Sequence, residues 1–154
     1  MCKFILATLP RATELRQLEA SIPAVLRRRL VRLGPGEYAP AEVVAIEEVG
    51  NSFVAKQLPS GDRLVRLTRM PCDCWSDLGR RRNLGTPSKE IRRWLALIRL
   101  WIERGSANRI GLFIHFGDPG DAIVLRGPIV HEIAGVNVAH LELWDWDTIH
   151  EFVG

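Results

Sequence analysis

The stretch Arg63-Leu-Val-Arg-Leu-Thr-Arg-Met-Pro-Cys-Asp-Cys-Trp75 predicts a strand that ends at two of the three cysteines of the chain. Alternate residues of a strand project to the same side. Cys72 and Cys74 therefore point the same way if the extended geometry continues to them. The third cysteine, Cys2, precedes the apolar run Lys3–Leu9, which is typical of a central strand. Because strand ends can lie side by side in a sheet, these two segments could bring the three cysteines together.

Helix and strand signals follow one another in blocks along the chain. Residues 15–33 carry apolar side chains at helical spacing, and Pro23 should divide this helical region. The clearest helix opens at Thr86, its predicted N-cap, and closes at Gly105. Residues 42–49 fit a strand or a short helix, and we assign them as a strand. Turn residues and apolar patterning predict further strands over residues 53–58, 63–69, 110–116, 122–126, 128–133 and 136–144.

This order of elements indicates the fold class. A strand, helices, several strands, a helix and several more strands are typical of an α+β protein. We expect one α+β domain over residues 1–154, with two or three helices packed on one face of a mainly antiparallel sheet. A chain of 154 residues is long enough to bury one such core without disulfide bonds.

The composition is that of an ordinary globular protein, with 47% hydrophobic and 25% charged residues. No apolar segment has the length that spans a membrane, and the apolar run at the start is too short for a signal peptide. We therefore expect a cytoplasmic protein without a membrane partner. In that reducing compartment the three cysteines are expected to be thiols or metal ligands rather than structural disulfides.

The net charge of +3 conceals an asymmetry along the chain. Residues 1–110 hold 20 Lys and Arg against 11 Asp and Glu, whereas residues 111–154 hold one arginine against seven acids. The balances are +9 and −6. The acidic part also contains all four histidines, which are His115, His131, His140 and His150.

The three cysteines are a candidate metal site. Cys2, Cys72 and Cys74 with one histidine would complete the four ligands of a tetrahedral zinc. The single residue between Cys72 and Cys74 departs from the two-residue spacing of common zinc sites. Unliganded thiols and a redox pair are the competing interpretations. We therefore expect no cofactor, with zinc as the alternative.

A second candidate for chemistry is His115 with Asp118 and Asp121, at the end of a predicted strand and in the loop after it. An imidazole and two carboxylates could bind a divalent cation or act as a general base. However, the loop sequence Asp-Pro-Gly-Asp also suits a tight turn that has no chemical role. The sequence therefore assigns no catalytic residue.

Basic residues cluster before and within the clearest helix. They could neutralise phosphate groups of a nucleic acid. No nucleic-acid-binding motif accompanies them, so a solvated basic face is the competing interpretation. These residues are Arg80, Arg81, Arg82, Lys89, Arg92 and Arg93.

Near the C-terminus the sequence Trp144-Asp145-Trp146-Asp147 alternates indoles with carboxylates, and Glu142 and Glu151 lie close by. In an extended segment the two tryptophans share one face and the two acids the other. The tryptophans could then belong to the core while the acids lie in water. The alternative is a partner-binding surface, because tryptophan anchors among negative charges suit docking to a basic protein.

Two motifs, Met1-Cys-Lys-Phe-Ile-Leu-Ala-Thr-Leu-Pro10 and Cys72-Asp-Cys-Trp-Ser-Asp-Leu-Gly79, together resemble small bacterial proteins found as partners of secreted toxins. This resemblance implies an immunity-type protein that binds a cognate toxin and neutralises it by occlusion. It assigns no catalytic residue, so we expect a binding protein rather than an enzyme. A metal- or thiol-dependent enzyme centred on the three cysteines is the alternative, and a nucleic-acid-binding domain is the third hypothesis.

Overall fold

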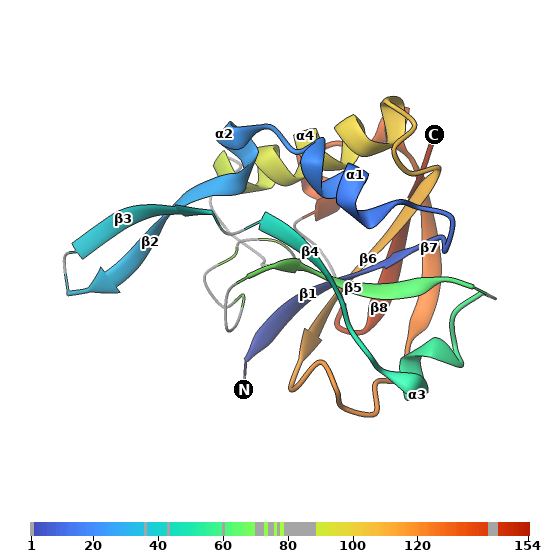
Figure 1. Cartoon of the computed structure of the whole chain (residues 1–154). Helices are drawn as coiled ribbons and strands as arrows, with labels where there is room; N and C mark the ends of the chain where they lie inside the picture. Colours follow the sequence, from blue (N-terminus) through green and yellow to red (C-terminus); the bar gives the residue numbers. More distant parts are fainter. Residues whose placement is uncertain are drawn as a thin grey trace.

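The computed structural model describes residues 2–154 apart from 36, 43, 60, 70–72, 74, 75, 77, 79–88 and 142–144. The fold is α+β, as the sequence predicts, with a six-stranded sheet, a separate two-stranded sheet and short helices around one long helix (Figure 1). Among the described residues, no helix combines the length and apolarity needed to cross a membrane.

The larger sheet is built around β1 (Lys3–Leu9), whose seven residues are all buried. Adjacent strands run antiparallel, except that the edge strand β7 runs parallel to β8. In spatial order the sheet contains β4 (Val44–Glu48), β5 (Arg63–Thr68), β1, β6 (Arg109–Phe116), β8 (Thr148–Val153) and β7 (Arg126–Glu132).

Helices α1 (Leu15–Ala20), α2 (Ala24–Arg27) and α4 (Lys89–Glu103) lie over one face of this sheet (Figure 1). The apolar side of α4 packs into the larger core cluster, in which Trp101 is fully buried. Helix α3 (Ser52–Ala55) belongs to the opposite face, where a smaller cluster forms. The helices therefore cover one face much more fully than the other.

The segment after α2 corrects the sequence prediction. Helical spacing continued to residue 33, but the chain leaves the helix and forms β2 (Arg28–Gly34), which pairs with β3 (Glu37–Glu42). This hairpin projects away from the six-stranded sheet (Figure 1). The glycine and proline that can stop a helix also reverse a hairpin, so local signals did not separate the two outcomes.

Three other predictions of strands were wrong. Residues 53–58 begin within α3, because the Asn51 side chain accepts hydrogen bonds from the Phe53 and Val54 amides and caps a helix. Residues 122–125 form no strand, and the described part of 136–144 forms the 3₁₀ helix η2 (Val138–Leu141), after η1 (Ile133–Gly135). Strand β8 was not predicted, and it pairs with β6.

Candidate functional site

Trp146 lies on the surface in the turn that precedes β8. Its side chain is 55% exposed, and its ring lies 4.4 Å from that of Phe116, centroid to centroid. The Arg126 guanidinium donates a hydrogen bond of 2.5 Å to the Trp146 carbonyl oxygen. Phe116 therefore contacts the indole and Arg126 holds the backbone of Trp146, while the side chain stays presented to solvent.

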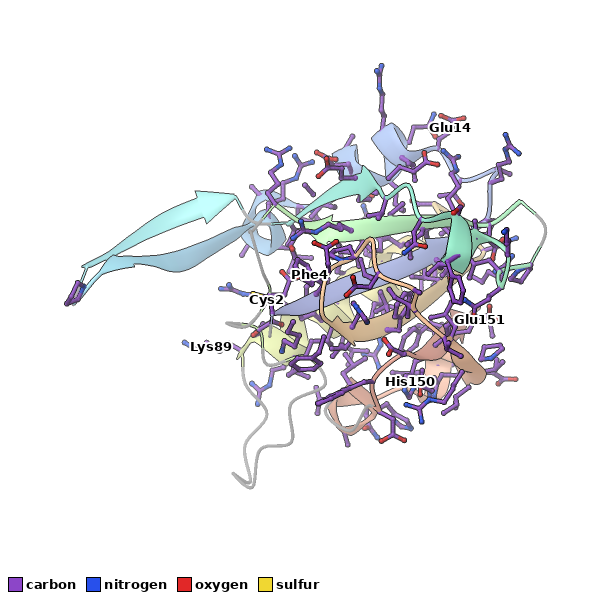
Figure 2. All side chains as sticks on the ribbon, turned by 90° about the horizontal axis from the view of Figure 1, so that it is seen from below. Cys2, Phe4, Glu14, Lys89, His150 and Glu151 are labelled. Atoms are coloured by element: carbon purple, nitrogen blue, oxygen red, sulfur yellow. The ribbon has the colours of Figure 1, made fainter. Side chains whose placement is uncertain are left out.

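The acids around Trp146 do not share one environment. Asp145 is exposed, but the Asp147 Oδ1 atom lies 2.8 Å from the His115 Nδ1 atom. Glu151 points elsewhere, because its carboxylate lies 3.4 Å from the Arg109 guanidinium, which also binds Asp62. Figure 2 shows Glu151 well away from the start of β1. The predicted partner residues Glu142 and Trp144 lie outside the described part of the chain.

Exposed apolar side chains continue from Trp146 onto the edge of the sheet. Val124, Ile129 and Val130 are 66%, 48% and 56% exposed. Strand β7 begins two residues after Val124, and its first residue, Arg126, donates the hydrogen bond to the Trp146 carbonyl oxygen. Strand β7 is at the edge of the sheet, and an edge strand with exposed apolar side chains can dock another chain. We call this the Trp146–β7 surface; it comprises Val124, Arg126, Ile129, Val130, Asp145 and Trp146.

His115 lies beside this surface and is 6% exposed. A carboxylate only accepts hydrogen bonds, so the contact with Asp147 places a proton on Nδ1 and leaves a lone pair on Nε2 of the neutral ring. The Nε2 atom is buried and makes no hydrogen bond to any described residue. Its nearest carboxylate oxygen is Oδ2 of Asp121, at 3.8 Å. This geometry suits an imidazole that takes up a proton at Nε2.

The loop after β6 joins one of the two predicted acids to His115. Asp121 approaches the imidazole, whereas Asp118 accepts a hydrogen bond from the Gly120 amide within the turn. The Asn51 side chain ties this loop to α3 by donating to the carbonyl oxygens of Pro119 and Asp121, at 2.8 and 2.9 Å. Sequence reasoning had grouped His115 with both acids and missed Asp147, because Asp147 is 32 residues away and reaches His115 only through the fold.

A second group of histidines joins β7, β8 and η2. The His131 Nε2 atom lies 3.0 Å from the His150 Nδ1 atom, and the His131 and His140 ring centroids are 5.6 Å apart. Burial, and then the nearby His131, lowers the pKa of His150 from 6.5 to about 4, although Asp145 opposes this shift. Burial also lowers the pKa of His131, and His140 adds to that effect. These rings therefore favour the neutral form in the fold.

The described neighbours of the cysteines contact one another. The Asp73 amide donates a hydrogen bond of 2.7 Å to the Lys3 carbonyl oxygen, and the Asp73 carboxylate accepts from the Ile5 amide and the Thr68 hydroxyl. Burial raises the pKa of Asp73, and these hydrogen bonds oppose the shift. Cys2 is exposed. The contact with Lys3 therefore places Asp73 beside the start of β1, next to the residue that follows Cys2.

The sequence-predicted zinc site is only partly within the described structure. Cys72 and Cys74 lie outside it, as do Arg80, Arg81 and Arg82 of the basic cluster. Within the residues that are described, no group of three or more His, Cys, Asp or Glu side chains has the arrangement of a metal site. Zinc at the three cysteines therefore stays a prediction.

Comparisons with protein-family models, with curated proteins and with solved structures find no match to this chain.

Proposed function

We propose that this chain is an immunity-type binding protein, which neutralises a cognate secreted toxin by occlusion through the Trp146–β7 surface. The observation that carries the proposal is the 55% exposure of Trp146, whose position is nevertheless fixed by Phe116 and Arg126. A rigid, exposed indole loses little conformational freedom on binding and can bury a large apolar area. Such residues dominate the binding energy of many interfaces.

The charge around Trp146 indicates the kind of partner. Asp145 is exposed next to it, and Asp121 is exposed on the loop that approaches His115. An apolar anchor among carboxylates matches a basic protein surface that carries an apolar pocket. The same carboxylates repel phosphate groups, so this surface does not suit a nucleic acid. A partner held here would have its own surface covered without any chemical step, which is what occlusion requires.

The proposal is tested by expressing the product of the adjacent gene in cells, with and without this chain. If that product is toxic, the chain should restore growth, and the purified proteins should form a complex. Trp146→Ala should weaken that complex by about 30-fold, the effect of losing a hot-spot anchor. Asp145→Lys should also weaken it, with a smaller loss at high salt because exposed charges are screened.

The matched control is Val25→Ala, because Val25 is a 66% exposed apolar residue on α2, which lies over the helix-covered face and away from β7 (Figure 1). It should leave the affinity unchanged. Equal losses for the Val25 and Trp146 variants, or no loss for either, would remove the Trp146–β7 surface as the binding site. A non-toxic gene product would count against the immunity-type function itself.

A further inference from the structure

We infer that Cys2, His115 and Asp147 form a nucleophilic thiol site that accepts acyl groups from esters or thioesters. This activity goes beyond the proposed binding function and does not depend on it. It rests on strand register, on the buried ring nitrogen of His115 and on the unusual backbone of Asp147. Each of these observations is independent of the others.

The register of β1 and β6 brings Cys2 to His115. Phe4 lies opposite His115, and the Gly117 amide continues this pairing by donating a hydrogen bond of 2.9 Å to the Cys2 carbonyl oxygen. Cys2 therefore lies opposite Gly117, and alternation places its side chain on the same face as Phe4 and His115. Figure 2 views this face and shows Cys2 beside Phe4 at the start of β1.

Gly117 leaves the space opposite Cys2 for the imidazole. A Cβ atom on Gly117 would lie 2.6 Å from the Asp121 Oδ2 atom and 2.7 Å from the His115 Nε2 atom, so these two side chains occupy the position of the missing side chain. Directly opposite residues in an antiparallel pair have Cβ atoms about 5 Å apart. A rotation about the Cys2 Cα–Cβ bond can therefore bring the exposed thiol toward Nε2. The Nε2 atom makes no hydrogen bond to the described residues, so its lone pair is available for that thiol.

Asp147 completes the site as a positioning residue. Among the described residues it is the one non-glycine with a positive φ, at 55°. Its amide donates a hydrogen bond to the carbonyl oxygen of Ile114 in β6, and its own carbonyl oxygen accepts one from the amide of Arg126 in β7. Strands β6 and β7 therefore both hold this part of the backbone in place. Backbone in this region costs free energy and is often found where a side chain must be aimed. Here it aims a carboxylate at His115 Nδ1, which fixes the tautomer with the lone pair on Nε2.

These groups support the following acyl transfer. The His115 Nε2 atom takes the thiol proton while the sulfur attacks the acyl carbon, whose π electrons move to oxygen. The intermediate collapses as the bond to the alkoxide or thiolate leaving group breaks, and Nε2 returns the proton to that group. The product is an acyl-thioester on Cys2. Water can then attack the thioester by the same proton transfers, which releases a carboxylic acid and restores the thiol.

The test uses the purified, reduced full-length chain and p-nitrophenyl acetate as the probe. We expect nitrophenolate release with acetylation of Cys2, located by mass spectrometry of peptides. The rate should fall about 100-fold in His115→Gln, the usual scale of a lost general base. His140→Gln is the matched control and should react as fast as the unmodified chain. Cys2→Ser should abolish the modification.

Asp147→Asn provides a second variant if His115→Gln does not fold, because asparagine tolerates a positive φ. It should slow acetylation and also alter the ¹⁵N NMR shifts of the His115 ring, which report which nitrogen carries the proton. Acetylation of Cys72 or Cys74 instead of Cys2, or equal rates in the His115 and His140 variants, would overturn the site. So would one zinc per chain that is lost in Cys2→Ser, since Cys2 would then be a metal ligand. Toxin neutralisation by the Cys2→Ser variant would separate the two functions.

Discussion

Trp101 on α4 and Trp146 before β8 show how differently two regions of this molecule use the same side chain. Trp101 is fully buried, and its indole nitrogen donates a hydrogen bond of 3.2 Å to the Leu18 carbonyl oxygen across the helical layer. Trp146 keeps 55% of its surface in solvent. The helix-covered face of the sheet therefore uses apolar area for folding, whereas the β7 edge leaves apolar area exposed.

The largest effect is expected when each of the two indoles is removed in turn. Trp101→Ala should lower the free energy of unfolding by about 4 kcal/mol, because it leaves a large cavity and removes the hydrogen bond from the indole to the Leu18 carbonyl oxygen. Trp146→Ala should change it by less than about 0.5 kcal/mol, as is usual at the surface. Urea unfolding of both variants measures the difference. Similar losses would show that the β7 edge also stabilises the fold.

The next test concerns His150, which lies on β8 between the two regions. Its pKa is 6.5 ordinarily and about 4 in the fold, so between these values the unfolded chain binds more protons than the native one. Stability should be fully present above pH 6.5 and should fall by about 3 kcal/mol as the pH drops to about 4, at 1.4 kcal/mol per pKa unit. The raised pKa of Asp73 acts in the opposite direction, because the native chain takes up that proton more readily.

Thermal or urea unfolding between pH 6.5 and about 4 measures how steeply the free energy of unfolding depends on pH. His150→Gln should flatten it, while His140→Gln, in the same cluster, should leave most of it. A His150→Gln variant as acid-sensitive as the unmodified chain would show that the loss originates elsewhere. Such a result would place the acid-sensitive group outside β8.

Several elements that the sequence predicted well pack under the helices, although the strand predicted over residues 128–133 also corresponds to β7 at the edge. The run Lys3–Leu9 was predicted as a strand and is β1, and the apolar spacing near residues 91–102 predicted α4. In both segments the periodicity directly reflects burial, because one is buried on both faces and the other presents one side to the sheet. Residues 110–116 behaved likewise and form nearly all of β6.

The elements that sequence predicted poorly depend on partners far along the chain. Strand β8 pairs with two strands of opposite direction, and nothing within residues 148–153 specifies either partner. The site behaves in the same way, because the Asp147 carboxylate meets His115 only after β8 and β6 pair. The sequence indicated Trp146 as a candidate anchor because it is a tryptophan between two acidic residues. Its exposure, however, depends on the turn before β8. Local patterns cannot encode such distant pairings.

The smallest of the three tests examines the face opposite α4. Asn51 is 8% exposed and uses one side chain to cap α3 and to hold the loop of Pro119 and Asp121. Asn51→Ala should cost about 2 kcal/mol, because it removes a helix cap and the two hydrogen bonds that the Asn51 side chain donates to carbonyl oxygens of the loop.

Asn137→Ala is the matched control, since Asn137 is exposed and accepts a hydrogen bond from the Ala139 amide in a 3₁₀ helix. Its cost should stay below about 0.5 kcal/mol. Hydrogen exchange of the amides of Asp121 and Ile123 should also accelerate in Asn51→Ala, because the tie between α3 and the loop is lost. If exchange there stays slow while α3 loses stability, Asn51 acts only as a cap. The loop beside His115 would then be stabilised by the hydrogen bonds of its own turn. In that case α3 would contribute less to the stability of the less covered face than its contacts indicate.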